Sequence, residues 1–114
     1  MQRERISYNA VGFHAQQAAE KFLEALLTRH GIPFPKTHRI DELLVLLEPV
    51  TPGIKADLQE SAALSPFGAE IRYPYAHSDL NREEGAEAIR LATKVRAEVL
   101  SRLNDFLKRG RPKP

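Results

Sequence analysis

Arg72 and His77, with four residues between them, are the side chains of this sequence best suited to act on a phosphodiester. A histidine exchanges protons near neutral pH, so it can take the proton of a 2′-hydroxyl or give one to the leaving oxygen. An arginine keeps its charge and donates two parallel hydrogen bonds to phosphate, which suits it to stabilise an anionic phosphorane. Such a pair would cut RNA without a metal and leave a 2′,3′-cyclic phosphate and a 5′-hydroxyl.

The spacing of this pair carries little weight by itself, because an Arg followed by a His at four to six residues arises by chance roughly once in a chain of this composition. The alternative interpretation is structural. Arg72 would then pair with a carboxylate or with loop carbonyls, and His77 would be exposed. Tyr73 and Tyr75 would pack the loop. Pro74 disfavours a continuous helix between Arg72 and His77, so a turn or a dimer interface must bring the two together.

The remaining polar residues do not indicate a metal or cofactor site. The chain has four histidines and no cysteine, which removes thiolate chemistry and disulfides. No two histidines stand four residues apart with a carboxylate at ligand spacing, so we expect no bound metal and no cofactor. His14 flanks an apolar stripe and either bonds between helices or lines a dimer cleft. His38 either caps a helix, lies in solvent or reaches substrate.

Length and charge set broad limits on the protein. The 114 residues fit one domain, and 17 basic against 15 acidic side chains give a net charge of only +2. Bulk charge therefore does not indicate a nucleic-acid-binding protein. The first residues lack the apolar core of a secretory signal, and no apolar run approaches the roughly 18 residues that cross a bilayer. We expect a cytoplasmic protein with no membrane association.

Apolar residues at three- and four-residue steps predict the longest helices. One runs from about Ile6 to His30 and ends where Gly31 can adopt a left-handed conformation. Another begins at Asn81, which together with Glu84 resembles a capping box, and runs to about Lys108.

Two shorter helices are predicted between these long ones. The first has Thr37 as its N-cap and ends at Pro49; the next begins at Thr51–Pro52 and ends at Ser65–Pro66. Residues 65–80 then form a loop, and no strand is indicated. We therefore predict an all-α, antiparallel four-helix bundle over residues 1–109, followed by a basic tail, 110–114. The predicted core comprises Val11, Phe22, Leu26, Leu44, Leu47, Leu58, Val95, Val99 and Leu103.

Several separated blocks of the sequence suggest a family. They are FHAQQAAEK (13–21), LL (26–27), GI (31–32), PKTH (35–38), DELL (41–44) and RYP (72–74) before the last helix. In order and spacing these blocks resemble the HEPN domain of prokaryotes, and the resemblance covers nearly the whole chain.

This resemblance implies a dimerising helical bundle, commonly encoded beside a minimal nucleotidyltransferase as a toxin–antitoxin pair. Many HEPN proteins are metal-independent endoribonucleases that use an Arg and a His separated by four to six residues. Carried onto this chain, the resemblance makes Arg72 and His77 the catalytic pair. We expect substrate contacts from Tyr73, Tyr75, Asp79 and His14. The implied function is a homodimeric, toxin-type endoribonuclease with an antitoxin partner.

The alternative is a catalytically silent HEPN module that binds a nucleotide or scaffolds a nucleotidyltransferase partner. Tyr73 favours it, because active members usually carry a small polar residue after the arginine. Some HEPN toxins have a tyrosine two residues after the histidine that the nucleotidyltransferase modifies with AMP; here that position is Asp79, so this modification is not expected. A third interpretation is an unrelated helical interaction domain.

Overall fold

The computed structural model describes residues 7–68 and 80–110, with side chains as far as Lys108. In chain order the elements are α1 (Tyr8–Arg29), α2 (Ile40–Leu47), α3 (Ile54–Leu58), the 3₁₀ helix η1 (Gln59–Leu64), α4 (Ser65–Gly68) and α5 (Arg82–Gly110). Because α3, η1 and α4 follow one another without a break, they form one leg of the bundle, here called the third leg. The described residues contain helices and no strand, which confirms the predicted all-α four-helix bundle.

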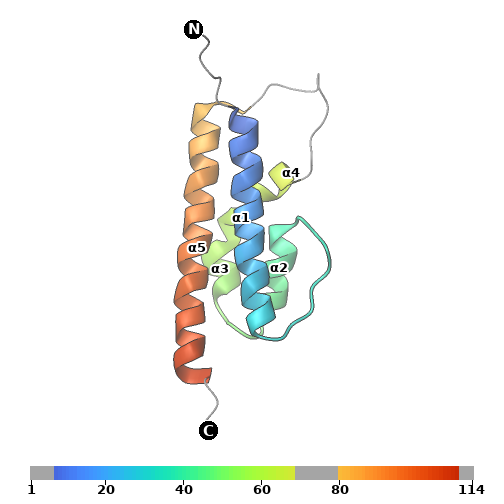
Figure 1. Ribbon diagram of the computed structural model, residues 1–114, viewed down its shortest axis with the longest axis vertical. Helices are drawn as coiled ribbons and strands as arrows, with labels where there is room; N and C mark the ends of the chain where they lie inside the picture. Colours follow the sequence, from blue (N-terminus) through green and yellow to red (C-terminus); the bar gives the residue numbers. More distant parts are fainter. Residues whose placement is uncertain (1–6, 69–79, 111–114) are drawn as a thin grey trace.

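The two long helices lie side by side and make the most extensive contact in the molecule (Figure 1). They run in the same direction, and not in the alternating order expected from short connections. At one end the N–H of Leu80, just before α5, bonds Asn9 near the start of α1. At the other end the ring of His30 packs edge-on against Phe106, with ring centroids 4.6 Å apart. The third leg runs antiparallel to both (Figure 1).

The connection between α1 and α2 explains this order. As predicted, Gly31 ends α1 in the left-handed region at φ 70°, and the N–H of Ile32 donates back to the carbonyl of Leu27. The chain then returns along α1 until His38 lies beside Gln16. The helix rises about 20 Å over that stretch, a distance that residues 30–39 span at roughly 3.3 Å per extended residue. Consequently α2 starts beside the middle of α1 and runs parallel to it.

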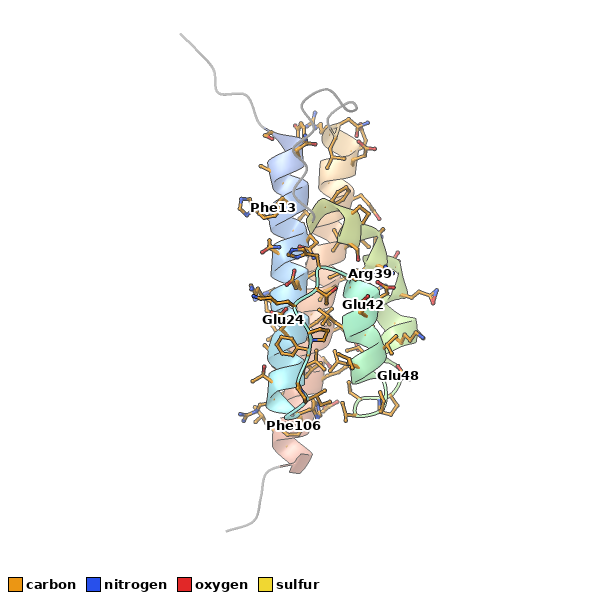
Figure 2. The ribbon with its side chains drawn as sticks, turned by 90° about the vertical axis from the view of Figure 1, so that its right-hand side faces the viewer. Phe13, Glu24, Arg39, Glu42, Glu48 and Phe106 are labelled. Atoms are coloured by element: carbon orange, nitrogen blue, oxygen red, sulfur yellow. The ribbon has the colours of Figure 1, made fainter. Side chains whose placement is uncertain are left out.

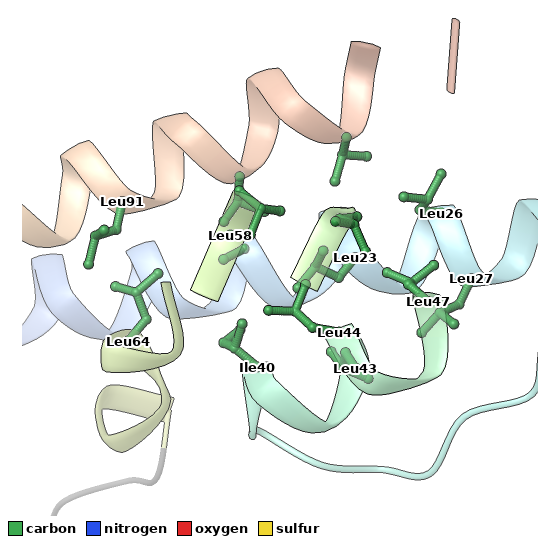
Figure 3. Packing of buried hydrophobic residues seen from close by; sticks show 14 of the residues in the cluster. Leu23, Leu26, Leu27, Ile40, Leu43, Leu44, Leu47, Leu58, Leu64 and Leu91 are labelled. Atoms are coloured by element: carbon green, nitrogen blue, oxygen red, sulfur yellow. The ribbon is translucent and has the colours of Figure 1, made fainter. Parts of the chain in front are cut away.

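Leucines and isoleucines from every helical leg pack into one core (Figure 3). Its largest fully buried side chains include Leu23, Leu26, Leu27, Ile40, Leu43, Leu44, Leu47, Ile54, Leu58 and Leu64. None of the side chains predicted to form the core is exposed; Val11, Phe22 and Leu103 are half-buried and the others are buried. Burial of these faces against one another is what holds the short helices, which would not be stable alone.

The start of α2 is capped from a distant part of the chain, and not by Thr37. The hydroxyl of Thr37 accepts from the N–H of Arg39, while the first helical N–H, that of Ile40, donates to Ser65 Oγ at 2.9 Å. Ser65 also begins α4, where the sequence predicted the helix to end. Pro66 is tolerated there because an N–H in the first turn has no intrahelical partner.

The start of α3 depends on Glu48 and not on Thr51. Gly53 is the N-cap, in the left-handed region at φ 95°, where a side chain would be strained. The Glu48 carboxylate accepts the N–H groups of Gly53 and Lys55, both at 2.9 Å, and lies over the turn between α2 and α3 (Figure 2). These two bonds, first that of Gly53, hold the pKa of Glu48 below its usual value.

The capping box predicted for α5 is confirmed. Asn81 Oδ1 accepts from the N–H of Glu84, and a Glu84 carboxylate oxygen accepts from the N–H of Asn81, both at 2.8 Å. These bonds satisfy two N–H groups at the helix start and fix the point where α5 begins.

Asn81→Ala should lower the free energy of unfolding by about 1 kcal/mol, because it removes one half of this box. Asn104→Ala is the matched control, since Asn104 is an exposed residue in the interior of the same helix. Urea titrations of both variants provide the measurement. Equal stabilities for the two variants would show that the box contributes nothing.

Candidate functional site

The predicted site residues between 69 and 79 lie outside the part of the chain that the structure describes; they are Arg72, Tyr73, Tyr75, His77 and Asp79. The structure does describe the residues on both sides of this segment. Gly68 ends α4, and Leu80 precedes α5. It also places His14, on the exposed side of α1.

Both ends of the segment 69–79 meet the N-terminal half of α1. The N–H of Leu80 donates to Asn9 Oδ1 at 2.8 Å. Leu80 and Phe67 both press against Gly12, where a Cβ would lie 2.8 Å from Leu80 Cδ1 and 3.3 Å from the Phe67 ring. A residue with a side chain would therefore not fit at position 12 without displacing one of them.

A polar cluster, here Gln16, Gln17, Glu20, Glu24 and His38, joins α1 to the connection before α2. Gln16 is fully buried, and its Nε2 donates to Glu20 Oε1 at 3.1 Å and to the carbonyl of His38 at 2.9 Å. Its Oε1 accepts from Gln17 Nε2 at 2.9 Å. His38 Nδ1 lies 3.0 Å from Glu20 Oε1; because an ionised carboxylate only accepts, Nδ1 carries the hydrogen. Every polar atom of the Gln16 side chain thus has a partner.

Sequence reasoning named His14 and His38 but missed Gln16 and Glu20. The available signal was the helical period, which puts Gln16 and Glu20 on the same face as the buried Ala19 and Leu23. A polar residue at a core-facing position requires a partner, and two of them four residues apart indicate a buried network. The His38 ring is 55% exposed, as one of the roles considered for it requires, and its bond to Glu20 was not among those roles.

The environment moves the pKa values of the two carboxyls of the cluster in opposite directions. Burial alone would raise the pKa of Glu20, but hydrogen bonds, first from His38 and then from Gln16, outweigh burial and hold this pKa below its usual value. Burial, followed by the hydrogen bond to Glu20 and the charge of Glu20, raises the pKa of Glu24. Glu24 is therefore the carboxyl of the pair that takes up a proton first as the pH falls.

An apolar groove runs between α1 and α5, and its volume is about 450 Å³. Its lining comprises Ala10, Val11, His14, Ala15, Ala18 and Phe22 of α1 with Ile89, Ala92, Thr93 and Arg96 of α5. Several of these side chains are exposed, Ile89 by 53%, so no other described element covers the groove. His14 contacts the ring of Phe13 and makes no hydrogen bond among the described residues. The interhelical hydrogen bond considered for His14 is therefore not formed within them.

Three basic residues of α5, namely Arg90, Lys94 and Arg102, are already paired with described carboxylates. Arg90 and Lys94 reach Glu60 on η1 at 3.1 and 2.7 Å. Arg102, only 17% exposed at its side chain, binds Asp57 and the Thr51 hydroxyl, each at 2.8 Å, so it connects α5 to α3 and to the turn before α3. Arg96 has no ion pair with any described residue, which leaves it as the cation available at the groove.

The family model of the HEPN domain matches residues 2–103. The chain belongs to the HEPN family. The matched range of this HEPN domain includes the segment with Arg72 and His77 and most of α5. No curated protein and no solved structure gives a significant match. Among the described residues of the HEPN domain, no three His, Asp or Glu side chains form a metal-binding group, and no helix is long and apolar enough to cross a membrane.

The opposite pKa shifts predict opposite pH dependences for two isosteric variants. The pKa of Glu20 is lowered by folding, so its stabilisation is present above the unfolded pKa and is lost as the pH falls through the folded pKa. Glu20→Gln should therefore destabilise the protein at about pH 7, and its deficit should shrink as the pH falls through the acidic range.

Glu24→Gln should behave in the reverse way. Because the pKa of Glu24 is raised, its stabilisation is present below the unfolded pKa and is lost as the pH rises through the folded pKa. A permanently neutral side chain avoids that loss, so the stability of Glu24→Gln relative to the native chain should increase from about pH 4 to about pH 7. Urea titrations at several pH values test both variants; parallel pH profiles would contradict the assignment.

Proposed function

We propose that this HEPN domain is a homodimeric, toxin-type endoribonuclease that cleaves RNA without a metal and is silenced by a nucleotidyltransferase antitoxin. The observation that carries the proposal is the Arg72–His77 pair within the matched HEPN range, between the end of α4 and the start of α5. No other Arg in the sequence is followed by a His after four to six residues.

In the proposed reaction His77 removes the proton from the 2′-hydroxyl or protonates the leaving 5′-oxygen. Arg72 donates paired hydrogen bonds to the phosphorane, where negative charge accumulates. Asp79, two residues after His77, would favour the charged imidazole. Tyr73 and Tyr75 provide aromatic faces on which unpaired bases stack, the usual mode of single-stranded RNA binding.

The apolar groove between α1 and α5 supports the homodimer. Its small side chains, Ala10 and Ala18, permit close approach of another helix, while Ile89 is too exposed for a side chain with no partner. The groove includes residues from the half of α1 that also holds Asn9 and Gly12. These two residues contact Leu80 and Phe67, which flank the segment 69–79. A two-fold axis through the groove would therefore bring two Arg72–His77 pairs, and His14 and Arg96 of both copies, to one interface.

A second candidate function is a silent HEPN module that binds a nucleotide or scaffolds the nucleotidyltransferase. Tyr73 favours this function, because it stands where active HEPN members usually carry a small polar residue. The two functions differ in a single measurable property, cleavage of RNA by the protein purified without a partner.

His77→Ala should abolish cleavage and change stability by less than about 1 kcal/mol, because a loop histidine contributes little packing. Arg72→Lys should lose most activity, since an ammonium cannot make the paired bonds of a guanidinium. Arg29→Lys, an exposed arginine at the other end of α1, is the matched control and should retain full activity. Cleavage in EDTA with a 2′,3′-cyclic phosphate product is expected. Equal cleavage by the native chain and His77→Ala would assign the activity to a contaminant and favour the silent module.

Ile89→Arg should convert the homodimer to a monomer, because it places a charge in the apolar groove. Val45→Arg is the matched control: Val45 is equally exposed, at 52%, but lies on α2, away from the groove. Light scattering at micromolar concentration measures both variants. A monomeric native chain, or an Ile89→Arg variant that remains dimeric, would rule out this interface.

A further inference from the structure

Three side-chain positions on one face of α1 contact the residues that bound the segment 69–79. Asn9, Gly12 and Gln16 follow one another at helical spacing, so they lie in a row. Asn9 Oδ1 accepts the N–H of Leu80, and Gly12 receives the Leu80 side chain. Gln16 receives Gly68: a Cβ at position 68 would lie 2.5–2.8 Å from the amide atoms of Gln16. We call this row the α1 seat.

Gln16 is held in place on several sides, so it cannot turn away from Gly68 at low cost. Its Nε2 is bonded to Glu20 and to the carbonyl of His38, and its Oε1 to Gln17. Displacement of this buried amide would leave polar atoms without partners, which costs about 1–3 kcal/mol for each such group. A glycine at position 68 is thus required by the close approach of α4 to a fixed amide.

The α1 seat fixes both ends of the segment within about one turn of the same helix, since Gly12 and Gln16 are separated by about 6 Å along its axis. A segment whose two ends are held to one rigid element has far fewer arrangements than one with free ends. None of the seat residues is charged at neutral pH; Gly12 and Gln16 are buried, and the Oδ1 of the exposed Asn9 is bonded to the N–H of Leu80.

We propose that Asn9, Gly12 and Gln16 are positioning residues, which set where Arg72 and His77 act by fixing both ends of the segment that carries them. The catalytic part of this inference rests on the proposed endoribonuclease function, whereas the fixing of the ends does not. Displacement of reacting groups by about 1 Å can lower a rate by about 100-fold. A methyl group added in the seat should therefore affect catalysis far more than it affects stability.

The test compares the same substitution at two helical glycines. At each of them an added Cβ would meet a side chain of another part of the chain. Gly12→Ala adds a methyl at the seat. Gly85→Ala is the matched control, because its Cβ would meet the Tyr8 ring at 2.7 Å but neither Leu80 nor Gly68. Both changes also gain helix propensity by the same amount. We expect kcat to fall at least roughly tenfold in Gly12→Ala and to stay within about twofold in Gly85→Ala, at matched stability.

A compensating variant separates positioning from general damage. Leu80→Val removes the Cδ1 atom that a methyl group added at position 12 would strike, so Gly12→Ala combined with Leu80→Val should recover most of the lost kcat. Loss of activity through instability alone would not be reversed, because shortening Leu80 removes packing. A double variant no more active than Gly12→Ala would overturn the catalytic part of the proposal.

Two nuclear magnetic resonance readouts test the seat without any reaction. Gly12→Ala should speed hydrogen exchange of the Leu80 amide at least about threefold, because that amide loses its bond to Asn9. Gly68→Ala should shift the side-chain amide signals of Gln16. If both signals stay at their native values, the seat does not fix the ends and the proposal fails. If the native chain does not cleave RNA but both signals change, the endoribonuclease function fails and the seat stands.

Discussion

The parallel contact between α1 and α5 is the constraint on which the rest of the structure depends. Two helices that run in the same direction need a return path between them, and the third leg supplies it. The returning leg and α2 cover one side of the pair and bury the leucine core there. The other side of the pair keeps the apolar groove. The same arrangement brings the start of α5 back to the start of α1, as the bond between Leu80 and Asn9 shows. Core, groove and the ends of the segment 69–79 thus follow from one pairing.

The buried cluster around Gln16 fixes the connection between α1 and α2 by chemistry that the leucine core lacks. Apolar contacts do not specify direction, so several registers of a helix against the core have similar energies. A buried amide is different, because each of its atoms must find a partner. Gln16 finds them in Glu20, Gln17 and the carbonyl of His38, which fixes the level at which the chain returns to begin α2. Glu20 adds to this specificity, because its hydrogen bonds with His38 and Gln16 outweigh the cost of burying its carboxylate and would be lost in another register.

Periodicity and capping chemistry predicted the helices, because these signals depend on residues close in sequence. The end of α1 at Gly31 and the box of Asn81 with Glu84 were foreseen for that reason. Contacts between residues that are distant in the sequence were not foreseen. Ser65 replaces Thr37 as the residue that satisfies the first N–H of α2, and no local pattern indicates this. The directions of the helices do not follow from local patterns, because a connection as short as residues 30–39 can still return along α1. In the candidate site, the residue types and their spacing predicted Arg72 and His77, which stay a prediction. The helical period could indicate that Gln16 is buried, but not that it bonds the distant carbonyl of His38.

The two halves of α1 make different contacts. Its C-terminal half is committed to the core through residues such as Leu23, Leu26 and Leu27, which are fully buried. Its N-terminal half carries little of that core and instead contacts Leu80 and Gly68 on one face and opens to the groove on another. Because the two halves are one continuous helix, a shift of a partner in the groove would move the seat as a rigid body. In the proposed homodimer, association and the placement of the segment 69–79 would therefore be coupled through α1.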